Sequence, residues 1–301
     1  MKFYFTSITD DDYLSYLIKN DCCNILISYL EKSKIKALLD KNLPNSDIFV
    51  DSGAFSAYTR NKKIDIDEYI TFLNTYHDRF SLYASLDVIP DYTSFESVQQ
   101  SSKDTWNNFV YMRERLTDKS KLLITFHLGE DYSVLRQILE YKDEFGPIKY
   151  LALGGLARAS IEDRDTFIEK CYNIINSCGR NDIKIHLFGV TDMGLCEKFG
   201  ADSVDSTTWI RAASFGEICT EFGRLVVSEA RKYDDKHLLH KTEFIKDKCI
   251  KEMTELGFLL DDLMTSSKSR ELYNILYFHN KSKLIQPPQF NRKITKCVEL
   301  W

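Results

Sequence analysis

Short runs of apolar, β-branched and aromatic residues recur along about the first 230 residues, and most of these runs are continuous rather than alternating. Continuous runs are typical of strands that are covered on both faces, as in a parallel sheet. Eight such runs predict strands at residues 2–7, 24–29, 47–52, 82–88, 122–128, 149–155, 183–189 and 202–207.

The stretches between these runs carry apolar residues at helical spacing. They predict helices at residues 10–20, 66–80, 133–145, 161–178, 192–200 and 211–233. Eight strands that alternate with helices predict an α/β fold, a parallel (β/α)8 barrel of the TIM type. A doubly wound open sheet is the alternative, because it shows the same alternation.

From about Arg231 onward the alternation stops, which predicts a barrel domain at residues 1–230 and a helical C-terminal region at residues 231–301. The second region has the pattern of two or three helices and an irregular end broken at Pro287-Pro288. The charged residues near this end are Lys281, Lys283, Arg292, Lys293, Lys296 and Glu299. Two interpretations stay open: a solvated basic end on a helical appendage, or a surface that docks nucleic-acid phosphates.

Charge and hydropathy narrow the class of protein. The formal net charge of −5 argues against a protein that coats nucleic acid non-specifically, although it is compatible with a local basic patch. No apolar run approaches the ~18 residues of a membrane span, and the N-terminus turns acidic too early for a signal peptide. We therefore expect a cytoplasmic protein. The eight cysteines are scattered and form no C-x-x-C, which argues against a disulfide framework and a zinc cluster.

Candidate chemistry lies at the ends of the predicted strands. In a β/α barrel the reactive groups sit at the C-terminal ends of the strands. Three carboxylates and one imidazole occupy these ends, those of Asp51, Asp87, Asp205 and His127. A strand-terminal Asp is often only the N-cap of the next helix. Three carboxylates that converge on one mouth are harder to explain in this way, so the sequence predicts an active site there.

Motifs at these strand ends resemble, in order, those of the tRNA-guanine transglycosylase superfamily, whose fold is a β/α barrel. The segment "DSGAF" (51–55) resembles the family's D-S-G-G-F/Y-Q, and "LGGLA" (153–157) matches its G-G-L-A loop. The segment "SLDVIP" (85–90) corresponds to the one that carries the base-reading Asp, and "HLFGV" (186–190) is similar to L-M-G-V. "VDSTTWIRAA" (204–213) resembles the nucleophile segment F-D-C-V-x-P-T-R-x-A. The similarity covers roughly residues 45–230.

The resemblance implies a glycosyltransferase that exchanges guanine in a nucleic acid for a 7-deazaguanine base without cutting the backbone. Asp205 would attack the anomeric carbon and hold the sugar covalently, as a retaining carboxylate does. Asp51 would be the general acid and base, and we expect its pKa to be raised by burial and by the neighbouring Asp87 and Asp205.

The resemblance also implies which residues would bind the base. Asp87 would read the Watson–Crick edge by accepting from N1–H and the exocyclic amine. Backbone groups of Gly154, Gly155 and Leu156 would complete this recognition, because glycine lets the main chain approach a base closely.

Five further residues are candidates for substrate binding. Phe55 and Phe188 would stack on the two faces of the base, or they belong to ordinary core packing. Ser52 lies in the turn after the acid/base. His127, where the family has Gln, would donate to the base O6 or be satisfied within its loop. Arg211 would pair with a phosphate beside the target nucleotide, or it is a solvated arginine.

The chain lacks the zinc module of the family, a C-x-C-x-x-C with a later His, so we expect no cofactor. His237, His240 and Cys249 form an H-x-x-H…C pattern. We interpret them as helix-surface histidines and a packed cysteine rather than a metal site.

Other departures concern the polymer partner. Ala54 and Ser56 replace the Gly and Gln of the first motif, and Trp209 replaces the Pro of the nucleophile segment. These departures fit the DNA-acting branch, the DpdA-like 7-deazaguanine DNA transglycosylases of bacteria and phages. We therefore expect DNA rather than tRNA as the partner, a 7-deazaguanine base as the small substrate, and no membrane partner. A homodimer stays open as the assembly.

Three alternatives stay open. The first is a queuosine-type tRNA-guanine transglycosylase. The second is a barrel hydrolase of glycosides or nucleosides, with Asp51 and Asp205 as its carboxylate pair and water as the acceptor. The third is a binding protein without catalysis.

Overall fold

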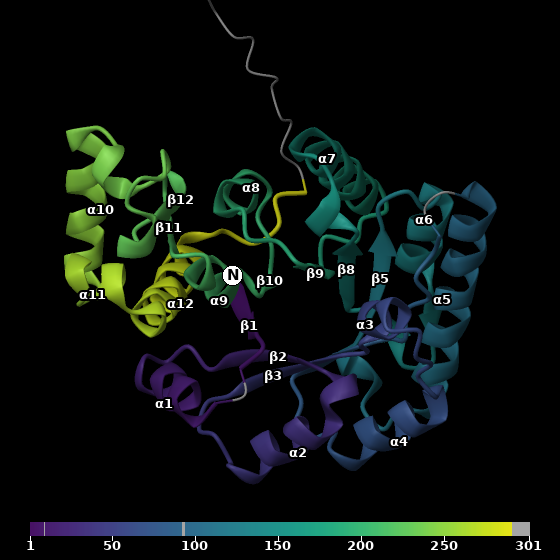
Figure 1. Cartoon of the computed structure of the whole chain (residues 1–301). Coiled ribbons are helices and arrows are strands. Elements are labelled where there is room, and N and C mark those ends of the chain that lie inside the picture. The colour runs from purple at the N-terminus through teal and green to yellow at the C-terminus, as the bar shows by residue number, and fades with distance from the viewer. Residues whose placement is uncertain (9, 92–93, 291–301) are drawn as a thin grey trace, which may run out of the picture.

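The computed structural model describes residues 1–8, 10–91 and 94–290, and its centre is a closed barrel of eight parallel strands (Figure 1). The strands are β1 (Lys2–Thr6), β2 (Asn24–Ser28), β3 (Asp47–Asp51), β4 (Leu82–Ala84), β5 (Leu122–His127), β8 (Tyr150–Gly154), β9 (Lys184–Leu187) and β10 (Ser203–Ser206). Because β1 pairs with both β2 and β10, the sheet has no open edge. The predicted (β/α)8 barrel is confirmed, and the open sheet is excluded.

Helices surround the strands on the outside of the barrel (Figure 1). They are α1 (Asp11–Lys19), α2 (Lys32–Asp40), α3 (Ala54–Thr59), α4 (Ile66–Thr75), α5 (Phe95–Arg115), α6 (Tyr132–Glu140), α7 (Ile161–Ser177), α8 (Met193–Phe199) and α9 (Thr208–Ser214). Several begin at an Asp or Ser whose side chain accepts from a backbone N–H of the first turn, as Asp65 and Ser160 do. At these positions a short polar residue therefore starts the helix.

Side chains alternate in direction along each strand and so form two apolar layers. One set of side chains points into the barrel and forms a small inner cluster, namely Tyr4, Leu26, Phe49, Leu82, Ala84, Leu123 and Ala152. Their chain neighbours, such as Phe5 and Val50, point outward into the larger core beneath the helices. Inward-facing residues at the carboxyl ends of the strands therefore lie above the inner cluster, where a ligand can reach them.

Two predicted helices are partly wrong, because each ends early and is followed by a β-hairpin. The helix predicted at 211–233 ends at Ser214 and is followed by β11 (Glu217–Thr220) and β12 (Gly223–Val226). Gly216 and Gly223 both have positive φ, which stops the helix and then turns the hairpin. Likewise α6 stops at Glu140, and β6 (Lys142–Asp143) and β7 (Gly146–Pro147) follow it.

Three helices have no counterpart among the predicted ones: α2, α3 and α5. The long helix α5 buries small polar side chains, those of Ser101, Ser102 and Thr105, on its inner face. This weakens the apolar periodicity that would have indicated a helix. In addition, β4 ends at Ala84 rather than near Val88, so Asp87 lies in a loop.

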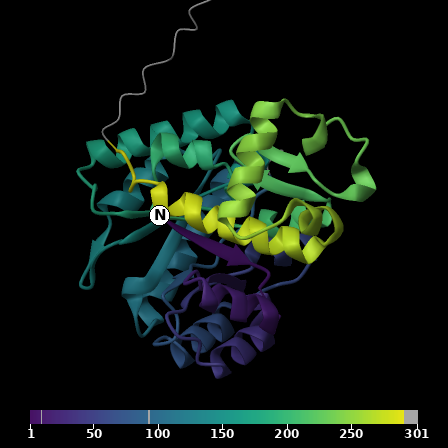
Figure 2. The same ribbon diagram turned by 90° about the vertical axis from the view of Figure 1, so that its left-hand side faces the viewer.

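The C-terminal region contains α10 (Glu243–Glu255), α11 (Leu260–Thr265) and α12 (Ser267–Leu284), in agreement with the two or three predicted helices. Helix α12 lies along β1 (Figure 2), where the rings of Phe3 and Phe278 stack 4.7 Å apart. The side chain of Asn274 joins α12 to the barrel by donating to the Trp209 carbonyl and accepting from the Cys219 N–H. This region therefore shares a core with the barrel, and the boundary at residue 230 stays a prediction.

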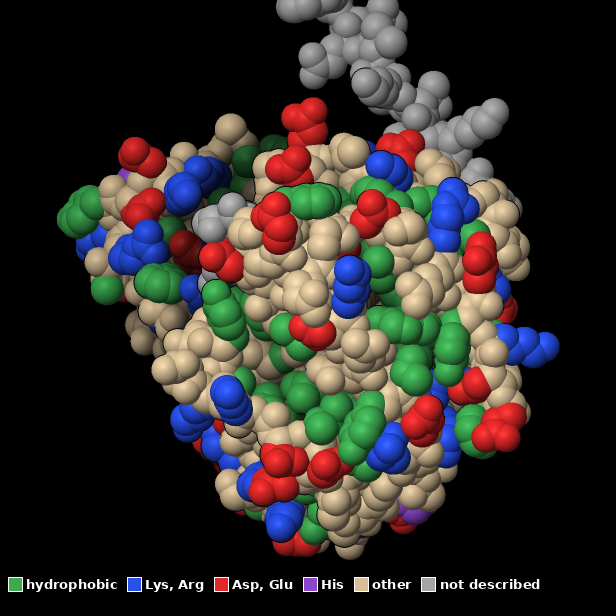
Figure 3. Space-filling view, turned by 90° about the vertical axis from the view of Figure 1, so that its right-hand side faces the viewer, with side chains coloured by type: hydrophobic (Ala, Val, Ile, Leu, Met, Phe, Trp, Pro, Cys, Tyr) green, Lys and Arg blue, Asp and Glu red, His purple; other side chains and the backbone are tan. Residues whose placement is uncertain are grey.

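The basic end of the chain is only partly described. Lys281 contacts Glu252 at 3.4 Å, and Lys283 is exposed. Arg292, Lys293, Lys296 and Glu299 lie outside the described residues, so docking by this end stays a prediction. On the face that Figure 3 shows, acidic and basic side chains are interspersed with apolar ones. Within the described part of the chain, no helix has the length and apolar character needed to cross a bilayer.

Candidate active site

The three predicted carboxylates lie at the carboxyl end of the barrel. Asp51 is the last residue of β3, Asp87 lies in the loop after β4, and Asp205 is an inward residue of β10. Burial, followed by the charges of Asp87 and Asp205, raises the pKa of Asp51 from 3.8 to about 7. An acid with a pKa near the working pH can both give and take a proton, so Asp51 is suited to general acid/base chemistry.

The turn after Asp51 explains the small residues that follow it. The Gly53 N–H donates to Asp51 Oδ2 at 3.0 Å, and Gly53 has a φ of +80°. A side chain at Gly53 would also collide with Ser28 and Leu30. Ser52 is buried, and its hydroxyl oxygen lies 3.4 Å from the Ala54 N–H. The turn therefore holds Asp51 rigidly at the strand end.

Asp205 is held by two donors on a single oxygen. The Gly189 N–H donates to Oδ1 at 2.8 Å, and His186 Nε2 lies 3.3 Å from the same atom. On the other side of the ring, His186 Nδ1 lies 2.9 Å from Ser203 Oγ. Among the described residues both hydrogen bonds go to Oδ1, which leaves Oδ2 for an incoming group.

His186 is absent from the sequence-based candidates. The signal that could have found it is a histidine inside the otherwise apolar run "IKIHLFG", at an inward position next to the predicted nucleophile strand. A buried polar residue in such a run needs a partner, and that partner is Asp205.

A second cluster connects Asp87 to the helix α5. His127 Nε2 lies 3.5 Å from Asp87 Oδ2, and His127 Nδ1 lies 2.9 Å from Glu130 Oε1. The Ser102 hydroxyl donates to the other Glu130 oxygen at 3.1 Å. Burial lowers the pKa of His127, but the hydrogen bonds with Asp87 and Glu130 outweigh it and raise this pKa to about 10. The two carboxylates on either side of the ring thus favour the protonated form of His127.

This cluster decides between the two interpretations of His127. Both ring nitrogens face carboxylates, so the ring has no N–H free to donate to a base O6. Its geometry fits a residue that orients Asp87. Asp87 Oδ1 is buried and has no hydrogen-bond partner among the described residues, which leaves an acceptor for a ligand donor. Glu130 was not predicted, since a lone Glu in a loop gives no sequence signal.

Gly154 and Gly155 are each needed as glycine, for two different structural reasons. A side chain at Gly154 would lie 2.5 Å from His127 Cδ2, so this glycine makes room for the imidazole. Gly155 has a φ of +81° and starts the short turn Leu156–Arg158. The Leu156 side chain is fully buried. Hence Leu156 can offer a base only its backbone.

Gly154→Ala is expected to lower the free energy of unfolding by about 1–3 kcal/mol, because the added methyl group overpacks the His127 ring. Urea unfolding measures this change. Gly194→Ala is the matched control: Gly194 lies in α8, and its added methyl approaches only Asp192 Oδ1, at 3.3 Å. Equal stability of the Gly154→Ala variant and the wild type would contradict this assignment.

The predicted aromatic and phosphate contacts differ in burial. Phe188 is half-buried, with its ring 4.5 Å from that of His186 and 5.9 Å from that of Phe49. Phe55 is 49% exposed on α3, and Arg211 is exposed on α9, directly after β10. Both phenylalanines follow strand ends of the same barrel face. Their stacking on a base, and the phosphate contact of Arg211, stay predictions.

The histidines of the H-x-x-H…C pattern differ from the expectation. His237 is fully buried and caps the short turn Leu238–His240 through Nδ1, so its interpretation as a helix-surface residue is wrong. His240 Nε2 lies 2.7 Å from the Lys232 carbonyl, and Cys249 is buried. Across residues 1–8, 10–91 and 94–290, no three His, Cys, Asp or Glu side chains form a group that could hold a metal ion.

Comparison with known proteins adds no name to this geometry. No family model matches the chain, and no curated protein matches it either.

Proposed function

We propose that the chain is a guanine transglycosylase of the tRNA-guanine transglycosylase superfamily, which exchanges guanine in a nucleic acid for a 7-deazaguanine base through a covalent ester on Asp205. The observation that carries this proposal is the difference between two carboxylates at one barrel mouth. Asp205 has one oxygen fixed by two donors, whereas Asp51 has a pKa raised to about 7. Such a pair suits a nucleophile and a general acid.

In the first half of the reaction, Asp205 Oδ2 attacks the anomeric carbon of the target nucleotide. The bond from this carbon to the guanine nitrogen breaks, and its electron pair goes to the base. Asp51 in its protonated form gives the proton that the departing guanine needs. The sugar is then held as an ester of Asp205, and the backbone of the nucleic acid is not cut.

In the second half, the incoming 7-deazaguanine nitrogen attacks the anomeric carbon. Asp51, now ionised, takes the proton from that nitrogen. The carbon–oxygen bond breaks, and its electron pair returns to the Asp205 carboxylate. The two halves use each carboxylate once in each direction, so the enzyme ends in its starting state.

Recognition of a guanine-like base is proposed to centre on Asp87. Its unpartnered Oδ1 accepts from the N1–H or exocyclic amine of the base, while His127 holds Oδ2. Phe55 and Phe188 are the proposed stacking partners, and the backbone at Gly154 and Gly155 approaches the base edge. A duplex base reaches such a mouth only when it is flipped out of the helix.

We favour DNA over tRNA as the polymer. The support for this choice is the sequence alone: the zinc module is absent, and Ala54, Ser56 and Trp209 depart from the tRNA-enzyme pattern. Trp209 is fully buried, and its indole N–H donates to the Thr6 carbonyl, so this departure belongs to the barrel core rather than to the base pocket.

The proposal is tested by incubating the protein with guanine-labelled DNA and, separately, guanine-labelled tRNA, together with 7-cyano- or 7-aminomethyl-7-deazaguanine. We expect release of label from DNA that depends on the added base. Release from tRNA alone would overturn the DNA preference. Release from DNA that is independent of added base, with water as acceptor, would favour the hydrolase. No release from either polymer by folded protein would overturn transglycosylation.

A further inference from the structure

We propose that His186 is a positioning residue for Asp205, and that it acts mainly on the second half of the reaction, in which the sugar leaves Asp205. This inference depends on the proposed function, because it assigns a role within the exchange reaction. It concerns a residue that the motif comparison does not identify as part of the site.

Three aromatic rings and the neighbouring strand fix the orientation of the His186 ring. The side chain is 1% exposed, and it faces the rings of Phe188 at 4.5 Å, Phe49 at 5.0 Å and Tyr4 at 6.2 Å, each edge to face. Register places it beside Ser203, which pairs with His186 across β9 and β10. A ring packed in this way keeps one orientation toward Asp205.

The hydrogen bonds determine what the ring does. A carboxylate oxygen can only accept, so the contact between His186 Nε2 and Asp205 Oδ1 requires the proton on Nε2. Nδ1 then accepts from the Ser203 hydroxyl, at 2.9 Å. Asp205 therefore selects the tautomer with the proton on Nε2, and the Ser203 hydroxyl, which can donate or accept, satisfies Nδ1.

A donor on Oδ1 affects the two halves of the reaction differently. When Asp205 attacks through Oδ2, it loses negative charge, and a hydrogen bond to Oδ1 weakens. When the ester breaks down, the carboxylate regains its charge, and the same hydrogen bond becomes stronger. His186 and the Gly189 N–H thus make Asp205 a better leaving group. Loss of the His186 donor is expected to lengthen the life of the covalent intermediate.

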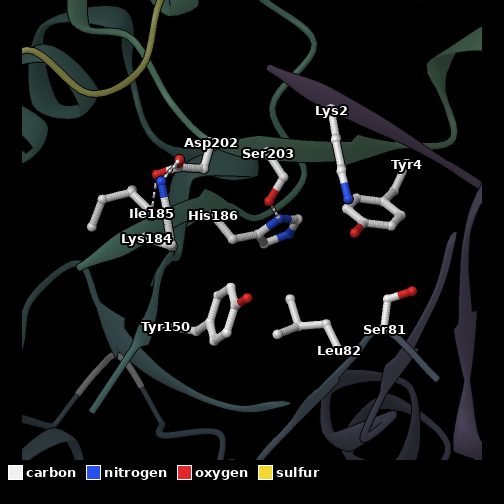
Figure 4. Close-up of a pocket in the computed structure, with 10 residues that line it drawn as sticks. All are labelled: Lys2, Tyr4, Ser81, Leu82, Tyr150, Lys184, Ile185, His186, Asp202 and Ser203. Atoms are coloured by element: carbon white, nitrogen blue, oxygen red, sulfur yellow. Dashed lines mark hydrogen bonds and ion pairs between the residues drawn. The ribbon is translucent and has the colours of Figure 1, made fainter. Parts of the chain in front are cut away.

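The side of His186 that faces away from the mouth is accessible to small molecules from solution. The ring lines a cavity of about 270 Å³ near the N-terminal ends of the strands, together with Lys2, Ser81, Tyr150 and Ser203 (Figure 4). Removing the imidazole would extend this cavity to Asp205. A small ring added to the solution can then enter from the end of the barrel that is opposite to the mouth.

The experiment measures the lifetime of the covalent adduct. Wild type and His186→Ala are each loaded with end-labelled DNA, chased with 7-aminomethyl-7-deazaguanine, and quenched with denaturant at increasing times. We expect adduct decay to slow by roughly tenfold or more in His186→Ala, since a hydrogen bond to a charged group is lost. Added imidazole should restore the decay, and thiophene, a ring of similar size without an N–H, should not.

Two further variants separate positioning from packing. Ser81→Ala alters the same cavity away from Asp205, and it should decay like the wild type. His186→Gln keeps an N–H donor and His186→Met fills similar volume without one, so decay should be faster in the glutamine variant. These two variants carry the test if His186→Ala does not fold.

The outcomes distinguish the two proposals. Absence of any adduct in folded wild type would overturn the proposed function. An adduct in wild type that decays at the same rate in His186→Ala, or at the same rate in His186→Gln and His186→Met, would overturn the role of His186 and leave the proposed function intact. Restoration by thiophene as well as imidazole would also overturn it, because filled volume alone would then explain the effect.

Discussion

Replacing Asp205 with alanine is expected to lower base exchange by about 10⁴-fold or more and to leave no covalent protein–nucleic acid adduct. The reason is that no other side chain takes over the covalent role once the nucleophile is removed. Exchange is measured by label release, and the adduct is measured by denaturing gel electrophoresis with labelled DNA.

Asp205→Asn protects this test against a folding defect. The amide has nearly the same shape, and its oxygen can still accept from Gly189, so the fold should persist while the nucleophile is lost. Asp47→Asn is the matched control, because Asp47 begins β3 at the opposite end of the barrel and pairs with Lys2. An adduct that persists in either Asp205 variant would mean that the nucleophile is misassigned.

Replacing Asp51 with asparagine should have two large effects of opposite kind. Base release should fall by a factor of about 10² to 10⁴, since the general acid is lost. At the same time the folded state should become more stable at alkaline pH, because an ionised, buried carboxylate beside two others is no longer present.

The sign of the stability effect follows from linkage. The pKa of Asp51 is raised from 3.8 to about 7 in the folded state, so the fold binds this proton more tightly than the unfolded chain. The stability that this gives is fully present below pH 3.8 and is lost as pH rises through about 7. Relative to wild type, Asp51→Asn should gain about 2–4 kcal/mol at pH 8 and little near pH 4.

Urea unfolding of both proteins at several pH values between 4 and 8 measures this difference. A gain that is the same at every pH would contradict the raised pKa of Asp51. In wild type, single-turnover release of guanine should also decrease as pH rises above about 7, because Asp51 must be protonated for this step. Release that continues to increase above pH 8 would contradict the acid role.

The barrel could be predicted from the sequence because most of its strands are short, continuous apolar runs separated by helical stretches. The two hairpins could not be predicted in this way. In the β11–β12 hairpin, the apolar residues of "FGEICTEFGRLVV" have a spacing that also fits a helix, and the positive φ of Gly216 and Gly223 prevents one. Helix α5 has no such apolar pattern: it buries serine and threonine beside apolar side chains, so its inner face is only partly apolar.

In the candidate site, too, the sequence predicts some residues and not others. The strand-end rule predicts Asp51 and Asp205, because an inward residue at the end of a barrel strand must face the mouth, and it predicts Asp87 although that residue lies in the loop after β4. The partners of these carboxylates depend on contacts between strands. His186 reaches Asp205 from the neighbouring strand, and Glu130 folds back onto His127 through a loop. The spacing of residues along the sequence predicts neither of these contacts.

Locating the covalent adduct by mass spectrometry tests most directly whether Asp205 is the nucleophile. The protein is trapped with DNA under denaturing conditions, treated with nuclease to leave a short sugar-containing remnant, and digested with trypsin. We expect the remnant on the tryptic peptide of residues 199–211, at Asp205. A remnant on Asp51 or on any other residue, or no adduct with a DNA or tRNA substrate that releases guanine, would contradict it.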